Sequence, residues 1–575
     1  MFSKIETWDI LIIAAYFGIV FLIAIWVTLQ ERKKKEASEE GYFLGGRNIG
    51  WFVIGASLFA SNIGSEHLVG LAGAGARGDM ASAQFEILAA LILLVLGWIF
   101  VPFYLKSGVF TMPEFLEKRY NSSARTFLSV ISIIAYVLTK ISVTIFAGAL
   151  VFETMLEVPF WSGATIVVVA TGIYTIFGGL KAVIYTDMMQ MFVLVGGALA
   201  LTYFGLQGLA VGIIGTEEAG GWDGVRAAID ALAPERADNY FSLWRDFSDR
   251  EYPWTGILFG APILGVWYWC TDQFIVQRVL SAKDESNARK GTIFGGFLKM
   301  LPLFLFVIPG LIAFALTQNN PDLLMNTAGE IEYDAALPAL VMNYLPVGFK
   351  GLMVASLLAA LMSSLSSVFN SCSTLFTIDF YQRYRPKASG KELVRVGQIA
   401  TVVLVVIGLA WIPLMKTLTQ GEGIFKYLQS VQAYISPPIA AVFMLGLFFK
   451  RINSFGALTS LWTGFVLGVS RLVMEYITSG YEEGTAVWNI SPDSWFATYV
   501  EVNFLHFAIF LFVVCSVVMF AASMSRPAPA PESLKNVTYE PSGRKFTFST
   551  DVLTTGVLVV IVIVIWFIFS PLGIA

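Results

Sequence analysis

Six hydroxyl and amide side chains gather within nine residues of the apolar stretch ASLLAALMSSLSSVFNSCS, at 355–373. They are Ser363, Ser364, Ser366, Ser367, Asn370 and Ser371. Positions 363, 366, 367 and 370 share one face of a helix. One hydroxyl on a membrane helix commonly bonds back to a carbonyl of its own backbone or packs against a neighbour. A cluster of six instead favours oxygen ligation of a small hard cation.

A second polar interruption is the segment FASNIGSEHLVGLAGAG, at 59–75, inside an apolar stretch long enough to cross a bilayer. Its polar side chains are Ser61, Asn62, Ser65, Glu66 and His67. Hydrocarbon penalises charges and unsatisfied backbone groups, so this stretch must face protein, water or a ligand. Glycine and short polar residues favour a helix that breaks in mid-membrane, where secondary transporters hold ions and substrates. We expect carbonyls freed at the break to bind the cation together with the serines.

Ionisable residues also occur within predicted spans, at Glu66, Glu86 and Lys299. Such groups are costly in hydrocarbon and indicate a functional site, although an internal salt bridge that fixes helix packing is the alternative. Asp187, in AVIYTDMMQMF, is predicted at the cytoplasmic start of a span. It is either a solvated or helix-capping carboxylate or a ligand for a cation on its way to the cytoplasm.

Neutral polar groups and aromatic rings accompany these charges. Gln429 lies in the span FKYLQSVQAY, Tyr268 and Trp269 lie in WYWCTDQ, and His67 is expected in a polar pocket rather than in the core. Rings stack on C–H faces, and side chains hydrogen-bond hydroxyls, so the set is typical of a site for a neutral polyhydroxyl. Aromatic residues alone would indicate only core or interface packing.

The composition sets the class of protein that carries these residues. Of 575 residues, 56% are hydrophobic and 14% are charged, and the mean hydropathy is +0.71, whereas soluble domains carry about 25% charged residues. The chain is therefore a polytopic helical membrane protein. No basic block indicates nucleic acid, and Cys270, Cys372 and Cys515 have neither metal nor disulfide spacing. We see no Walker loop, Rossmann fingerprint or catalytic set, so neither an enzyme nor a bound cofactor is expected.

We predict fourteen membrane-spanning helices. They begin near Trp8, Gly50, Ser82, Thr126, Phe160, Val183, Pro253, Gly291, Pro346, Val396, Gly423, Phe455, Val500 and Asp551. Lysines and arginines are concentrated in alternate loops, which places both termini outside the cell membrane.

Two five-helix sets with interrupted first helices begin near Gly50 and Pro253, and this pattern points to an inverted repeat. The predicted units follow from it. They are an accessory helix and loop at 1–48, a first repeat at 49–208, an external loop at 209–252, a second repeat at 253–447, accessory helices at 448–523, a cytoplasmic linker at 524–548 and a last helix at 549–575.

Several long motifs resemble the sodium/glucose cotransporters of the solute:sodium symporter family, and the resemblance covers nearly the whole chain. They are YFLGGRNIGWFVIGASLFASNIGSEHLVGLAG, WYWCTDQFIVQRVLSAK, GLMVASLLAALMSSLSSVFNSCSTLFTIDFY and PPIAAVFMLGLFFKR. The resemblance implies a LeuT-type fold of two inverted five-helix repeats with accessory helices at both ends. It also implies a monomeric symporter that couples sodium influx to hexose uptake, with sodium as a transported ion. The absence of a long cysteine-bearing external loop favours a bacterial member.

Residue roles follow from the resemblance position by position. It implies a first sodium site made by the carbonyls of Ala60, Ile63 and Ala360 and the hydroxyls of Ser363 and Ser364. It implies a second sodium site, present in only some members, made by Asp187, Ser363, Ser366 and Ser367. The implied sugar pocket contains Asn62, His67, Phe85, Glu86, Tyr268, Trp269, Lys299 and Gln429, with Tyr268 as an inner gate.

Two positions depart from the family pattern. Gly265 stands where members have a side-chain contact to the sugar, and Ala89 replaces a serine contact of a bacterial member. The alternatives are a sodium symporter for another solute, such as myo-inositol, sialic acid or a carboxylate, and a sugar-gated sensor or channel. Glutamine at 429 argues against the sensor, where glutamate would be expected.

Overall fold

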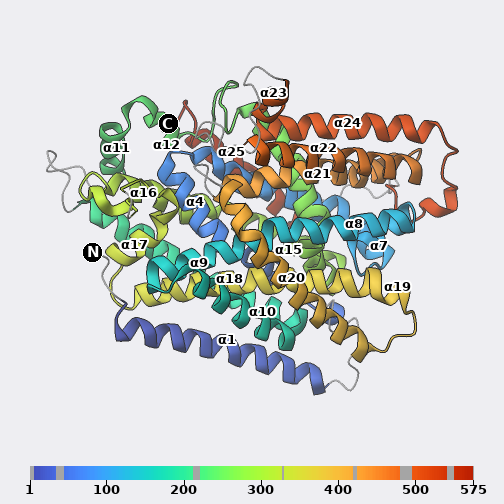
Figure 1. Ribbon diagram of the computed structural model, residues 1–575, viewed down its shortest axis with the longest axis horizontal. Coiled ribbons are helices and arrows are strands. Elements are labelled where there is room, and N and C mark those ends of the chain that lie inside the picture. Colours follow the sequence, from blue (N-terminus) through green and yellow to red (C-terminus); the bar gives the residue numbers. More distant parts are fainter. Residues whose placement is uncertain are drawn as a thin grey trace.

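The computed structural model describes residues 5–33, 45–210, 221–326, 329–418, 424–478, 495–539 and 549–573. Nearly all of this part of the chain is helical, and its only β-structure is two isolated bridges, Ile49 with Ala282 and Met325 with Ile331. In Figure 1 many of the long helices lie roughly along one axis. Helix α1 (Thr7–Lys33) lies along one side of the bundle and α24 (Phe504–Met524) on the opposite side. The prediction of an all-α membrane protein is confirmed.

Eleven helical segments in the described ranges are long and apolar enough to cross a membrane. They are Thr7–Val27, Met80–Ser107, Ser122–Glu153, Leu180–Gly208, Glu285–Leu316, Phe349–Tyr384, Arg395–Pro413, Phe425–Phe448, Ser454–Ile477, Phe504–Met524 and Thr550–Ile568. Shorter apolar helices, Trp51–Asn62, Phe160–Val169 and Gly256–Thr271, stand at the three other predicted spans.

Helices that form these segments or connect them have the following bounds: α5 (Gln84–Val95), α7 (Met112–Arg119), α8 (Ser122–Tyr136), α9 (Ser142–Leu156), α11 (Gly221–Leu232), α12 (Ala237–Phe241), α15 (Glu285–Leu298), α16 (Ile308–Leu316), α17 (Ala336–Tyr344), α20 (Gly390–Leu418), α21 (Ile424–Phe448), α22 (Ser454–Thr478), α23 (Trp495–Glu501) and α25 (Thr550–Ile568).

The predicted spans at Phe160 and Val183 lie on a single helix, α10 (Phe160–Ala210), of 51 residues. The Gly-Gly pair of IFGGLKAV does not end this helix, because glycine is tolerated inside a helix at a cost of only about 1 kcal/mol. Asp187 therefore lies inside a continuous helix and does not cap one, although it is near the start of the apolar segment Leu180–Gly208, where the span was predicted.

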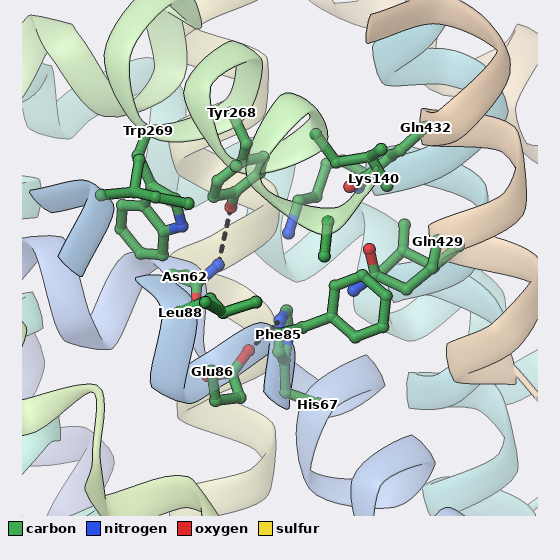
Figure 2. Close-up of a pocket in the computed structure, with 15 residues that line it drawn as sticks. Asn62, His67, Phe85, Glu86, Leu88, Lys140, Tyr268, Trp269, Gln429 and Gln432 are labelled. Atoms are coloured by element: carbon green, nitrogen blue, oxygen red, sulfur yellow. Dashed lines mark hydrogen bonds and ion pairs between the residues drawn. The ribbon is translucent and has the colours of Figure 1, made fainter. Parts of the chain in front are cut away.

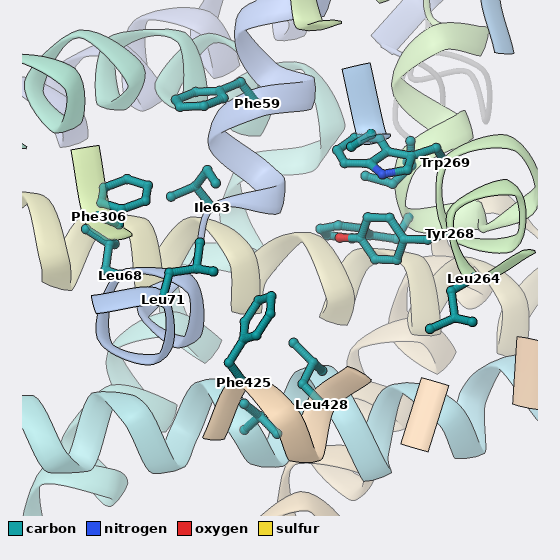
Figure 3. Packing of buried hydrophobic residues seen from close by; sticks show 14 of the residues in the cluster. Phe59, Ile63, Leu68, Leu71, Leu264, Tyr268, Trp269, Phe306, Phe425 and Leu428 are labelled. Carbon is teal, nitrogen blue, oxygen red and sulfur yellow. The ribbon is translucent and has the colours of Figure 1, made fainter. Parts of the chain in front are cut away.

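Both predicted interruptions are breaks in the helical backbone. α3 (Trp51–Asn62) ends where Ile63 turns to φ −79°, ψ 91°, and α4 (Ser65–Arg77) begins after the extended Gly64. The second break is at Asp272, with φ −78° and ψ 130°, between a π-helical turn η7 (Val266–Thr271) and α14 (Gln273–Leu280). Asp272 caps α14, because its carboxylate accepts from the Phe274 amide at 3.2 Å. Apolar side chains, Phe59, Ile63, Leu68 and Phe306 among them, fill the space around the first break (Figure 3).

The serine-bearing helix α18 (Phe349–Thr374) packs against α1, α3, α10 and α20. Its start is fixed by α1, because Asp9 Oδ1 accepts from the amides of Gly348 and Gly351 at 2.7 and 2.8 Å. Gly351 must lack a side chain, since a Cβ there would lie 2.4 Å from the Asp9 carbonyl oxygen. These contacts attach the N-terminal end of α18 to α1.

The described part of the segment that follows α24, up to Tyr539, packs against the helices. Leu534, Val537 and Thr538 are buried, and the Tyr539 amide donates to the Leu447 carbonyl at 2.7 Å. A short 3₁₀ turn, Pro531–Leu534, interrupts it. Residues 540–548 of the predicted linker lie outside the described residues.

Candidate functional site

A pocket opens where the two broken helices face α21 (Figure 2). Its lining consists of Asn62, His67, Phe85, Glu86, Leu88, Ile92, Lys140, Ala261, Leu264, Gly265, Tyr268, Trp269, Leu428, Gln429 and Gln432. Seven of the eight side chains predicted for the solute site are in this set, and the exception is Lys299. The structure thus gathers side chains from α3, α4, α5, η7 and α21 around one space.

Hydrogen bonds connect the two breaks across the pocket. The Asn62 amide donates to the Tyr268 hydroxyl at 2.8 Å, and Lys299 donates to the Asn62 amide oxygen and to the Glu86 carboxylate. Lys299 is fully buried, with its ammonium 5.2 Å from the centre of the Trp269 ring. The salt bridge considered as an alternative for Glu86 and Lys299 therefore exists, yet Glu86 also lines the pocket.

One wall of the pocket is aromatic. The Phe85 ring meets the Phe425 ring edge to face, with centroids 6.0 Å apart, and the His67 ring lies 6.2 Å from Phe425. His67 Nε2 is 3.8 Å from a Glu86 carboxylate oxygen. Opposite this wall, Tyr268 and Trp269 pack edge to face at 5.1 Å. The space therefore has apolar faces together with a carboxylate, an imidazole and amides.

The residues of the predicted first cation site lie on α18 and at the C-terminal end of α3, two helices that pack against each other. Ala60, Ile63, Ala360, Ser363 and Ser364 are all buried where α3 breaks against α18. The Ser364 hydroxyl donates to the Ser61 carbonyl at 3.1 Å, which directly joins the two helices. Hydroxyl and carbonyl oxygens are the ligands that a hard cation prefers.

Asp187, of the predicted second cation site, is completely buried, and one of the three predicted serines bonds it directly. Ser363 donates to one of its carboxylate oxygens, and Ser57 donates to the other at 2.8 Å. The Ser366 hydroxyl instead bonds back to the Ser363 carbonyl of its own helix at 3.0 Å. The interpretation of Asp187 as a solvated carboxylate is wrong, because α10 lies against α3 and α18.

The sequence resembles one family of known proteins over most of its length. The profile of the Sodium:solute symporter family matches residues 42–464. The chain belongs to the sodium:solute symporter family. It is 40% identical to sodium/glucose cotransporter 4 of Danio rerio, over 92% of this chain and 80% of the relative. It is 41% identical to sodium/glucose cotransporter 1 of Ovis aries (90% and 78%) and to a sodium/mannose cotransporter of Bos taurus (92% and 89%).

The symporter also shares its fold with a structure of a sodium-coupled sialic acid symporter in a substrate-bound, outward-open state. The TM-score is 0.72 at 21% identity, over 91% of this chain and 99% of the other. Family membership confirms the expectation of a transporter instead of an enzyme, with sodium as a transported ion and no cofactor of its own. Among the described residues, no group of three histidine, cysteine or carboxylate side chains could hold a metal ion.

Two polar residues of the symporter's pocket were missed in the sequence. Lys140 lies in a π-helical turn, Val137–Ile141, with its ammonium 5.0 Å from the Tyr268 ring centre, and Gln432 follows Gln429 on α21. Lys140 is an ionisable residue within a span, and Gln432 is one helical turn after Gln429. Both signals could have found them.

The two departures from the family pattern have different positions in the symporter. Gly265 lines the pocket, and a Cβ there would lie 2.1 Å from the Ile92 Cδ1 atom, so Ile92 fills the space of the missing side chain. Ala89 is buried and does not line the pocket. The side chains of Ser65 and Glu66 lie outside the described residues.

Proposed function

We propose that this protein couples sodium influx to the uptake of a hexose by alternating access. The observation that supports this most strongly is the pocket itself. A carboxylate, an imidazole and two glutamines meet aromatic rings packed edge to face there, directly beside the two helix breaks. Such a site offers hydrogen bonds to hydroxyl groups and apolar faces to a sugar ring. The printed substrates of the relatives, glucose and mannose, belong to the same chemical class.

Within this proposal, each side chain of the pocket has a distinct role. Glu86 accepts hydrogen bonds from sugar hydroxyls while Lys299, behind it, stabilises its negative charge. Gln429 both donates and accepts on the opposite wall. Tyr268 closes one side of the pocket as the inner gate, held by its hydrogen bond from Asn62. Asn62 lies at the end of α3, so cation binding at the break is transmitted directly to this gate.

Sodium would bind at two places in the proposed cycle. The first site uses the carbonyls of Ala60, Ile63 and Ala360 with Ser363 and Ser364, and the second uses Asp187, Ser363, Ser366 and Ser367. Each sodium ion supplies about 2.3 kcal/mol per 100 mV of membrane potential. A tenfold gradient adds about 1.4 kcal/mol per ion. Two ions would therefore concentrate a sugar far more strongly than one.

The membrane arrangement belongs to the same proposal. The chain would cross the plasma membrane fourteen times, with two inverted five-helix repeats, 49–208 and 253–447, and both termini outside. The functional unit would be a monomer in the lipid bilayer. The pair of broken helices, at Ile63 and Asp272, supports the repeats because each break falls in the first helix of a set.

The substrate is tested by uptake into proteoliposomes with an inward sodium gradient. We expect labelled glucose, galactose or mannose to accumulate with sodium outside and not with potassium. Gln429→Ala should reduce this uptake by at least about tenfold, the equivalent of roughly 1.4 kcal/mol of binding. The control, Gln207→Ala, removes an exposed glutamine of α10 that bonds Tyr203 and should leave uptake unchanged.

A second candidate substrate is an acidic solute such as sialic acid. Lys140 lines the pocket, so its ammonium could attract the carboxylate of such a solute. The same assay decides between the two, because sodium-driven uptake of sialic acid or myo-inositol without any hexose would overturn the hexose proposal. Sodium currents evoked by a sugar that is itself not taken up would establish the sensor or channel instead.

A further inference from the structure

The Arg278 guanidinium occupies the ligand set proposed for the second sodium ion. Its Nη2 atom donates to Ser367 Oγ at 2.6 Å and lies 3.4 Å from Asp187 Oδ2, and its Nε atom donates to Ser57 Oγ at 3.0 Å. The side chains of Arg278 and Asp187 are 1% and 0% exposed. Two of the four proposed sodium ligands, Asp187 and Ser367, are thus already bound to a cation that belongs to the protein.

The Asp187–Arg278 pair has no net charge that a second cation could neutralise. One carboxylate faces one guanidinium, so the pair is neutral and fully buried. A sodium ion added without any rearrangement would set two positive charges against one negative charge. Burying an uncompensated charge costs several kcal/mol. Sodium at Asp187 therefore requires the guanidinium to withdraw from it.

Arg278 also connects this cluster to the second helix break. It lies on α14, which begins directly after the break at Asp272, while Asp187 and Ser367 lie on α10 and α18. Its guanidinium donates to the Phe274 carbonyl and lies 4.9 Å from the Phe274 ring centre. That ring is 6.4 Å from the ring of Tyr268, the proposed inner gate. Movement of Arg278 would therefore shift Phe274 and, through it, the Tyr268 ring that lines the solute pocket.

We propose that Arg278 is an internal cation that fills the second sodium site while it is empty of sodium. Sodium binds there by displacing the guanidinium from Asp187 and Ser367. The displacement releases α14 from α10 and α18, so that occupancy of the cation site is transmitted to Tyr268. The inference rests on the proposed sodium symport and assigns to Arg278 the role of a positioning residue that competes with the transported ion.

The first test compares the sodium affinity of charge-changing variants. Sodium-dependent rise of the melting temperature is measured in purified protein, with potassium as the replacement ion. Arg278→Gln removes the competing charge and should lower the sodium concentration for half-maximal effect by about tenfold, a change of roughly 1.4 kcal/mol. In an Asp187→Asn background, the same substitution should have no effect on sodium affinity. The control, Arg385→Gln, removes an exposed arginine and should match the wild type.

Weaker or unchanged sodium binding in Arg278→Gln would overturn the proposal, since a purely structural ion pair can only support the site. So would a shift of the same size in the Asp187→Asn background. A second measurement needs no variant and remains decisive if Arg278→Gln does not fold.

Hydrogen exchange of the wild-type protein in sodium and in potassium supplies this second measurement. Sodium should slow exchange in 363–367 and speed it in 273–280, because α14 loses its anchor. If sodium protects 363–367 but exchange in 273–280 is slower or unchanged, the role proposed for Arg278 is contradicted, whereas the proposed sodium sites are not. No change in any segment would contradict the sodium sites themselves.

Discussion

Lys299 and Glu86 form a buried ion pair of which only the carboxylate reaches the solute pocket. The lysine therefore acts on the solute through its partner. Its ammonium also holds the Asn62 amide oxygen, so a single charged group supports both the carboxylate and the end of α3.

Removal of Lys299 alone should be more harmful than removal of both charges. Lys299→Met leaves the Glu86 carboxylate buried without its partner, which costs about 3–5 kcal/mol, so both the melting temperature and uptake should fall. In Glu86→Gln with Lys299→Met no charge remains, and the melting temperature should recover while sugar uptake stays absent. If the double variant melts no higher than Lys299→Met, the loss of stability does not come from the unpaired Glu86 carboxylate.

Asp187→Asn should remove the second sodium ion from the cycle. The Hill slope of sodium-dependent uptake is expected to fall from about two to about one, because the slope cannot exceed the number of coupled sites. Ser371→Ala, on the serine-bearing helix α18, is the control, since that hydroxyl bonds Gln277 instead of Asp187. A slope near one in both the wild type and Asp187→Asn would keep the symporter and exclude Asp187 as a ligand.

Gly265→Thr should fail unless Ile92 is also reduced. The new Cβ atom would lie 2.1 Å from Ile92 Cδ1, and such overpacking typically costs about 1–3 kcal/mol. Gly265→Thr with Ile92→Ala should recover the melting temperature and, by adding a hydroxyl to the pocket, lower the KM for its sugar. A single variant with wild-type stability and KM would mean that the space is already open.

The stability of the fold should depend on pH through Asp79, which lies between α4 and the following helix. Burial raises the pKa of Asp79 to about 6, with a contribution from Glu251, while Arg245 opposes the rise. The folded state therefore favours the neutral acid, and its stability should fall as pH rises from about 4 through about 6 and stay level above. Melting curves of wild type and Asp79→Asn over this range isolate the effect. A melting temperature of the wild type that rises relative to that of Asp79→Asn between about pH 4 and about pH 6 would contradict a raised pKa of Asp79.

Much of the site could be predicted because its residue types conflict with their surroundings. Asn62 and His67 beside glycines in an apolar stretch indicate a broken helix, and the break falls at Ile63 and Gly64. Glu86 and Gln429 are unusual in a span, and both line the pocket. Polar groups in hydrocarbon are costly, so composition alone identifies them.

What escaped prediction depends on distances between helices. Lys299 is also an ionisable residue within a predicted span, but the fold places its ammonium against Glu86, behind the pocket lining. Arg278 lies far from Asp187 in sequence, and no spacing indicates that they pair. The continuity of α10 could not be predicted from its glycine pair, because glycine disfavours a helix without necessarily ending it.

The most direct measurement of the central claim is sugar-driven sodium transport. Proteoliposomes with equal sodium on both sides receive an inward gradient of the transported hexose, and the entry of radiolabelled sodium is followed. Coupled symport predicts that the sugar gradient drives sodium inward until its internal concentration exceeds the external one. Gln429→Ala should abolish this accumulation. Sodium that equilibrates at the same rate with and without the sugar gradient would contradict coupling and leave a channel or a sensor.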